Sequence, residues 1–237
     1  RYDRIGHVPP SVEAIFPSPF AYHRRVLLAM PTDGPLPTEE GYADYLSDLV
    51  LNAVLKTAGG ALVLFTSYQL LMQTYERVAP KLREQGISCL YQGADERSRL
   101  LGRFSADTAS VLFATDSFWA GVDAPGETLK LVIVTRLPFR VPTHPVVLAR
   151  MAAIDRDGGN PFLDFSVPEA ITRLRQGFGR LMRHRGDRGI VLVADGRIVK
   201  KSYGALFVAS LPETQESRST TGAVLARVER FLEETAS

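Results

Sequence analysis

LVLFTSYQLL (Leu62–Leu71) contains the signals that decide the fold. Its first four residues are apolar, and Thr66, Ser67 and Tyr68 then lead into a segment with apolar residues at helical spacing. An uninterrupted apolar run indicates a strand that is buried on both faces, as in a parallel sheet covered by helices. Thr66 or Ser67 can cap the helix that follows, and the amides at its start can also hold a backbone phosphate.

The same alternation recurs along the chain. Strands are predicted at Val26–Met30, Ala61–Phe65, Ile87–Leu90, Val111–Ala114, Leu129–Thr135 and Ile190–Ala194. Helices are predicted at Glu39–Lys56, Tyr68–Gln85, Asp95–Phe104 and Pro168–Met182, with an amphipathic helix in the tail from Thr220. Strands that alternate with helices predict a three-layer α/β domain with a mostly parallel central sheet.

Composition narrows the class of protein. The chain is 45% hydrophobic and 23% charged with a net charge of +2, and its 28 basic residues comprise 23 arginines and 5 lysines. Arginine is the better bidentate partner for phosphate.

The single cysteine, Cys89, excludes an intrachain disulfide and argues against a cysteine-based zinc or iron–sulfur site. No apolar run approaches the ~18–20 residues of a membrane span, and no signal peptide is apparent, so we expect a cytoplasmic protein with no membrane partner. The start at Arg1 suggests a fragment of a longer protein.

An arginine-rich segment precedes the last apolar run. On a helix, Gln176, Arg180 and Arg183 would share one face because they are spaced by four and three residues. Gly177 and Gly179 each cost about 1 kcal/mol relative to alanine in a helix interior, and close approach of a ligand or backbone is the usual reason for such glycines. Two interpretations remain open, a polyphosphate clamp and a solvated basic helix.

A second polar segment, Ala114–Leu129, follows a buried strand at its carboxyl end, where open α/β sheets bind their ligands. Ser117 is expected to touch nucleic-acid backbone, and Asp123 to touch nucleotide. Phe118 and Trp119 are large aromatics in a polar loop. Each either folds back onto the core or stacks on a base, which is worth about 1–3 kcal/mol.

Two kinds of site are missing from the sequence. No G-x-x-x-x-G-K-[ST] phosphate loop occurs, and the one Asp-Glu pair, Asp95-Glu96, leads into a helix rather than following a strand. The four histidines lack the spacing of a zinc site or a catalytic triad. The chain can therefore supply only half of a nucleotide site.

In this order the segments resemble the second motor domain of a superfamily 2 helicase, and most of all the DinG-type branch of the XPD-like 5′→3′ DNA helicases. LVLFTSY (Leu62–Tyr68), DSFWAGVDAPG (Asp116–Gly126) and QGFGRLMR (Gln176–Arg183) resemble motifs IV, V and VI of that family. The connecting phrases also match: SPF at Ser18–Phe20, QG at Gln92–Gly93, TRLPF at Thr135–Phe139 and DRGIVLVADGR at Asp187–Arg197.

Composition, residue spacing and this resemblance together predict a division of the chain. We expect residues 1–17 to form an extended entry segment, residues 18–212 the second RecA-like domain with an insertion at about 140–160, and residues 213–237 a helical tail.

The resemblance also implies a nucleotide site. In the family, ATP lies between two RecA-like domains, and the first of them provides the phosphate loop and the Mg²⁺ ligands. Arg180 and Arg183 match the motif VI arginine fingers, which are the expected catalytic residues. The expected ATP-binding residues are Gln176, Gly179, Gly121 and Asp123.

The implied partners are single-stranded DNA and the N-terminal RecA-like domain of the same protein. The expected nucleic-acid-binding residues are Thr66, Ser67, Tyr68, Ser117, Phe118 and Trp119. An iron–sulfur cluster, where relatives carry one, belongs to the first motor half and not to this chain. We expect a nucleoid-associated protein with a role in DNA repair, and no ATPase activity from the isolated chain.

Two other classes of function are compatible with the sequence. A nucleic-acid-binding or regulatory module could keep the fold without motor activity. The presence of Arg180, Arg183 and Asp123 argues against a domain that has lost its motor function. An unrelated α/β enzyme could instead use the arginine-rich helix to bind a phosphorylated metabolite.

Overall fold

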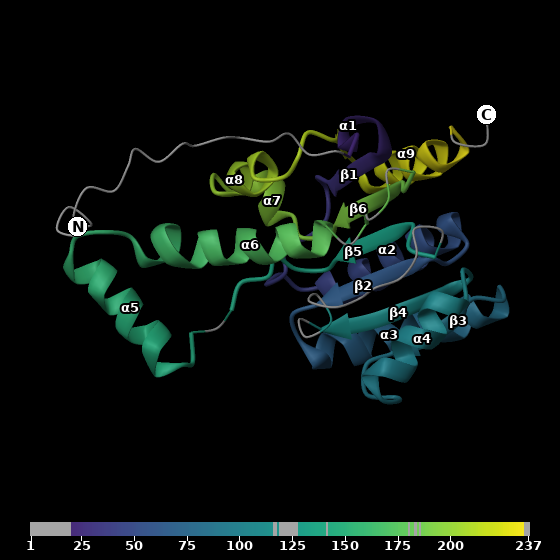
Figure 1. Ribbon diagram of the computed structural model, residues 1–237, viewed down its shortest axis with the longest axis horizontal. Coiled ribbons are helices and arrows are strands. Elements are labelled where there is room, and N and C mark those ends of the chain that lie inside the picture. The colour runs from purple at the N-terminus through teal and green to yellow at the C-terminus, as the bar shows by residue number, and fades with distance from the viewer. Residues whose placement is uncertain are drawn as a thin grey trace, which may run out of the picture.

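The computed structural model describes residues 20–115, 118, 128–140, 142–179, 181–182, 184 and 186–234. Its centre is a seven-stranded sheet in the order β3-β4-β2-β5-β6-β1-β7 (Figure 1). The strands are β1 (Val26–Pro31), β2 (Ala61–Phe65), β3 (Ser88–Tyr91), β4 (Ser110–Thr115), β5 (Leu131–Val134), β6 (Gly189–Val193) and β7 (Gln215–Ser219). Every pairing between these strands is parallel, which confirms the predicted class of α/β fold.

Helices cover both faces of the sheet because alternate strand residues point to opposite sides. In β2, Leu62 and Leu64 belong to one hydrophobic core, and Ala61, Val63 and Phe65 belong to the other. The first core is closed by α4 (Arg97–Ala106), α6 (Val167–Phe178), α7 (Arg197–Lys200) and α8 (Gly204–Ala209). The second core is closed by α2 (Tyr42–Thr57), α3 (Tyr68–Glu84) and α9 (Thr221–Glu233). The predicted three layers are thus confirmed.

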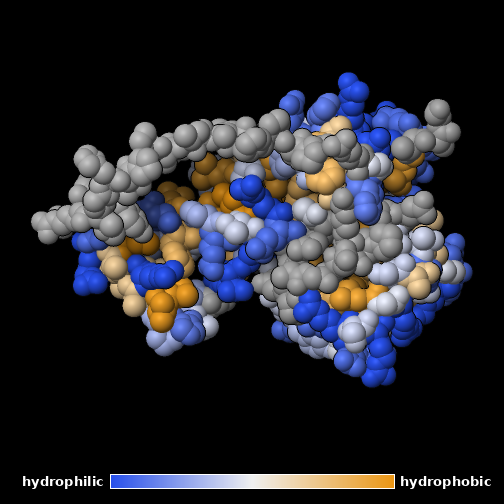
Figure 2. Space-filling model, in the orientation of Figure 1, coloured by the Kyte–Doolittle hydropathy of each residue, from blue (hydrophilic) through white to orange (hydrophobic). Residues whose placement is uncertain are grey.

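An arm extends from the sheet between β5 and β6. It consists of α5 (Pro145–Arg156) and the π-helix η2 (Phe162–Ser166), which continues directly into α6 (Figure 1). Neither α5 nor η2 contains a buried residue, and Figure 2 shows apolar side chains on the surface of the arm. The arm includes the segment expected as an insertion at about residues 140–160.

Two predictions about elements were wrong. The helix expected over Pro168–Met182 ends at Phe178, with Gly179 as its C-cap. Glycine is a poor helix former, and leaving the helix allows Leu181 and Met182 to turn into the core, where they are 1% and 3% exposed. The second error is β7 (Gln215–Ser219), which extends the sheet within the stretch expected as a purely helical tail.

Candidate nucleic-acid and nucleotide sites

Motif IV lies where β2 ends and α3 begins. Ser67 is in extended conformation, and its side chain accepts a hydrogen bond from the backbone N–H of Leu70 at 3.4 Å. Ser67 rather than Thr66 therefore caps the helix. The first turn of α3 directs its backbone N–H groups toward the carboxyl edge of the sheet, where an anion can approach them.

The neighbouring strand ends meet motif IV at this edge. Tyr68 is 48% exposed, and its hydroxyl covers Gly93 so closely that a Cβ added there would lie 2.8 Å from the oxygen. Gly93 also has a φ of +101°, so both the backbone and the contact require glycine. Gln92 accepts hydrogen bonds from the backbone N–H (2.7 Å) and hydroxyl (2.9 Å) of Thr115.

We call Thr66, Ser67, Tyr68, Gln92 and Thr115 the carboxyl-edge cluster. It joins the ends of β2, β3 and β4, three strands that are adjacent in the sheet. Gln92 and Thr115 were not among the residues expected at the site. The signal that could have found them is the QG phrase directly after an apolar run, together with the start of motif V.

The structure corrects the expectation that Phe118 binds nucleic acid. Its ring is 2% exposed and belongs to the core, and the Arg97 guanidinium lies 5.1 Å from the ring centroid. A buried ring cannot stack on a base, so of the two interpretations weighed for this aromatic the packing role is correct. Ser117, Trp119, Gly121 and Asp123 lie outside the described residues.

The motif VI segment begins at the end of α6. Gln176 and Gly179 are both exposed there, whereas Arg180 and Arg183 lie outside the described residues. The helix α6 ends at Phe178. The spacing of four and three residues therefore no longer predicts that Gln176 and these arginines share one helix face. Their expected roles rest on the motif alone.

This segment returns to the sheet at its amino edge. The backbone N–H of Ile190 donates to the carbonyl of Lys130 at 2.8 Å, just before β5 begins. Arg25, just before β1, donates from its guanidinium to the carbonyl of Gly186 at 2.8 Å. The residues that follow motif VI and the carboxyl-edge cluster therefore lie at opposite edges of one parallel sheet.

The buried carboxylate of Asp195 links two of the connecting segments, TRLPF and DRGIVLVADGR. Asp195, two residues after the end of β6, accepts hydrogen bonds from the backbone N–H of Leu137 (2.7 Å) and from the backbone (3.0 Å) and guanidinium (2.6 Å) of Arg197. Its side chain is fully buried. Burial acts to lower the pKa of the Arg197 guanidinium, but hydrogen bonding and charge attraction to Asp195, with smaller contributions from Tyr203 and Tyr42, together outweigh it and the pKa is raised. Through these hydrogen bonds Asp195 holds TRLPF against the start of α7.

Arg136 is a cation beside motif IV that sequence reasoning did not include. It donates to the carbonyl of Pro37 at 3.1 Å and lies 5.3 Å from the ring centroid of Tyr42. Burial raises the pKa of the Tyr42 hydroxyl, which donates to the carbonyl of Thr135. A cavity of 310 Å³ is bordered by Arg136, Tyr42 and Ser67, and Glu39 adds an acidic side chain to its lining.

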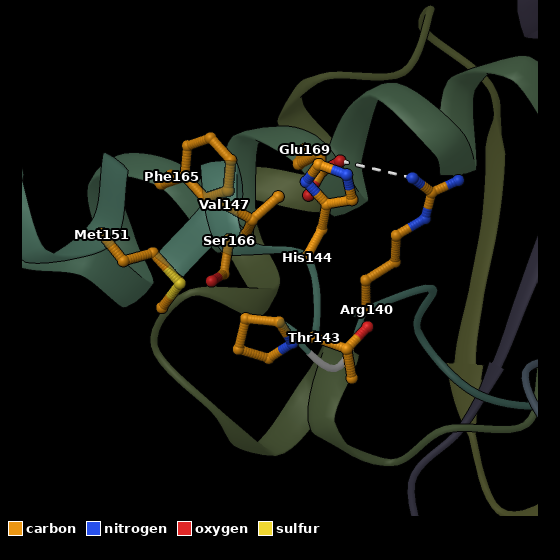
Figure 3. Close-up of a pocket in the computed structure, with 9 residues that line it drawn as sticks. Arg140, Thr143, His144, Val147, Met151, Phe165, Ser166 and Glu169 are labelled. Carbon is orange, nitrogen blue, oxygen red and sulfur yellow. Dashed lines mark ion pairs between the residues drawn. The ribbon is translucent and has the colours of Figure 1, made fainter. Parts of the chain in front are cut away.

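A second cavity, of 300 Å³, lies on the arm (Figure 3). Val147, Met151 and Phe165 form its apolar side, and Arg140 forms an ion pair with Glu169 at 3.9 Å across its edge. None of the expected site residues lines it. The cavity is therefore separate from the carboxyl-edge cluster.

Two kinds of feature are absent from the described residues. Within them, no cluster of three or more histidine, cysteine, aspartate or glutamate side chains could hold a metal ion. No described helix combines the length and apolarity that crossing a membrane requires.

The architecture and the sequence define the class. The fold is a RecA-like α/β domain, and the sequence matches the helicase C-terminal domain family over residues 50–214, so the chain belongs to that family. Among solved structures, Xpd4 of S. tokodaii has the same fold, with a TM-score of 0.58 and 15% identity over 81% of this chain and 38% of that one.

Two curated relatives give a narrower placement. The chain is 37% identical over 231 residues to the ATP-dependent DNA helicase YoaA of Haemophilus influenzae, covering 97% of this chain and 34% of that protein. It is 37% identical over 199 residues to the ATP-dependent DNA helicase DinG of Photobacterium profundum, covering 82% and 29%. The resemblance to DinG-type helicases is confirmed, and the chain spans about a third of the length of these relatives.

Proposed function

We propose that the chain is the second motor domain of an ATP-dependent helicase that moves 5′→3′ on single-stranded DNA. The observation that supports the proposal is membership of the helicase C-terminal domain family together with a RecA-like sheet, in which motif IV lies at the carboxyl edge and the residues that follow motif VI enter at the amino edge. The names of its relatives, which are ATP-dependent DNA helicases, support the same activity for the full-length protein.

Residues of motifs V and VI are proposed to complete a nucleotide site. Arg180 and Arg183 would reach the phosphates of ATP, where such arginines stabilise the charge that develops during phosphoryl transfer. Gln176 and Gly179 would border the nucleotide from motif VI, and Gly121 and Asp123 from motif V. The sequence lacks a phosphate loop, so ATP and Mg²⁺ would be held mainly by a first RecA-like domain elsewhere in the protein. Bound ATP supplies the free energy for closing the two domains.

The carboxyl-edge cluster is proposed to grip the strand. The first turn of α3, capped by Ser67, suits a backbone phosphate, and Thr66 lies beside it. The exposed ring of Tyr68 is available to stack on a base. Ser117 and Trp119 would contribute from motif V.

Three further assignments are part of the same proposal. They are a role in DNA repair, a cytoplasmic and nucleoid-associated location, and an iron–sulfur cluster, where the protein has one, in the first motor half.

The test is the Arg183→Ala variant of the full-length protein. We expect turnover of ATP with single-stranded DNA to fall by about 10³–10⁵-fold, because an arginine finger acts on the transition state, whereas affinity for the strand persists. Arg175→Ala is the matched control, since it removes the same charge from an exposed position of α6. An Arg183→Ala variant with parental turnover would refute the assignment.

Two further measurements separate the alternatives. The 237-residue chain alone should not hydrolyse ATP, and robust hydrolysis by it would contradict a half-site. A non-motor module predicts no DNA-stimulated turnover even in the full-length protein.

A further inference from the structure

The segment that carries the motif VI arginines is anchored at its end by the C-terminal helix of the domain. Leu181 and Met182 are buried in the core closed by α6, and the backbone N–H of His184 donates to the carboxylate of Asp187 at 2.8 Å. Arg188 is the last residue before β6. What holds Arg188 therefore fixes the position at which the segment ends.

Arg188 is held by α9. Its guanidinium carbon lies 3.8 Å from the ring centroid of Phe231, and it forms an ion pair with Glu234 at 3.4 Å. Only 14% of the Arg188 side chain is exposed. Arg227 also pairs with Glu234, at 2.9 Å, so one carboxylate serves two guanidinium groups. Burial lowers the pKa of Arg188, and Glu234 opposes that effect.

The helix α9 packs on the domain independently of the segment. Val224, Val228 and Phe231 are fully buried in the core that α2 and α3 share. Motif VI leads out of α6, which closes the other core. Arg188 therefore links the segment to the layer on the far side of the sheet.

We propose that Arg188, stacked on Phe231 and paired with Glu234, is a positioning residue that fixes the motif VI segment, so that α9 controls the rate of ATP turnover. This inference rests on the proposed function, because it requires Arg180 and Arg183 to act on ATP. It adds a role for a helix that lies beyond residue 214, where the match to the helicase C-terminal domain family ends.

The test uses Arg188→Met, Arg188→Lys and Glu234→Gln in the full-length protein, with ATP turnover, KM for ATP, single-strand affinity and Tm measured. We expect Arg188→Met to lower kcat by about 10–100-fold, as small displacements of catalytic groups do, while KM for ATP and strand affinity change little. Arg188→Lys keeps the charge but not the planar group that stacks, so it should restore kcat in part. Glu234→Gln should lower kcat less than Arg188→Met.

The chain offers a matched control on the same helix. Glu229 is exposed to the same extent as Glu234 (50% and 51%) and pairs with Lys56 on α2, away from motif VI. Glu229→Gln therefore makes the same chemical change and should leave kcat at the parental value. Because Glu234 is exposed, its variant also tests the proposal without a risk to folding.

Two outcomes would overturn the inference. One is an Arg188→Met variant with parental kcat. The other is equal kcat in Glu234→Gln and Glu229→Gln together with an Arg188→Met loss explained by a lower Tm. If Arg180→Ala and Arg183→Ala abolish turnover while the Arg188 variants are normal, the proposed function stands and only the positioning role fails.

Discussion

The buried Asp195 gives a quantitative test of the structure. Replacing it with alanine removes the acceptor for the backbone N–H of Leu137 and for the backbone and guanidinium of Arg197. Removing one partner of a buried ion pair typically costs about 3–5 kcal/mol, because the other charge stays desolvated. The Arg197 side chain is 24% exposed and can recover some water, which favours the lower end, about 3 kcal/mol. In a chain of this size each kcal/mol shifts Tm by about 2–4 °C, so we expect a fall of about 6–12 °C.

The assay is thermal unfolding of the 237-residue chain, with chemical unfolding as a second measure. Asp195→Asn keeps the size and one acceptor oxygen, and it should fall between alanine and the parental chain. The control is Glu216→Gln, which breaks an exposed ion pair with Arg218 (2.8 Å) and should cost no more than about 1 kcal/mol. If Asp195→Ala unfolds at the same temperature as Glu216→Gln, the carboxylate does not organise TRLPF and the reasoning is wrong.

Two further predictions concern aromatic side chains and the cysteine. Tyr68→Ala in the full-length protein should weaken single-strand binding by about 1–3 kcal/mol with an unchanged Tm, whereas Phe118→Ala should cost about 3–5 kcal/mol of folding stability; the reverse pattern would contradict the placement of both rings. Burial raises the pKa of the Cys89 thiol to about 11. Native Cys89 should therefore react with iodoacetamide at pH 8 about 100-fold more slowly than in urea, with a rate that rises as pH increases, because only the thiolate reacts. Equal native and unfolded rates would refute this.

The parts of the fold that the sequence predicts well are those whose burial is complete. The apolar runs in β1, β2, β4 and β6 stand out because helices cover both of their faces, so no polar residue interrupts them. β7 escaped prediction because it is an edge strand of the sequence QESRS, in which exposed and half-buried residues alternate. An edge strand needs no apolar run, and polar or charged side chains there also discourage aggregation.

The site was harder to predict than the fold. The sequence narrows the cap of α3 to Thr66 or Ser67 because capping depends on local sequence, and the structure shows that it is Ser67. Gln92 was missed because its contact with Thr115 joins residues that are 23 positions apart and depends on how β3 and β4 pair. Phe118 was instead included in the site although it is buried. Its burial depends on neighbours in the fold such as Arg97, and the polar stretch around it in the sequence does not reveal them.

The carboxyl-edge cluster and the residues that follow motif VI lie at opposite edges of the sheet. This explains why variants in motif IV and in motif VI should have separable effects. A strand of five residues, such as β2 or β6, spans about 17 Å, so the carboxyl-edge cluster and the residues that follow motif VI are separated by about the length of a strand. The interior between them is close-packed and apolar, and such an interior moves as a unit more readily than it deforms. Under the proposed function, a change at the nucleotide therefore reaches the strand by movement of the whole domain. Arg183→Ala should for this reason stop turnover without loosening Thr66, Ser67 and Tyr68 from the strand.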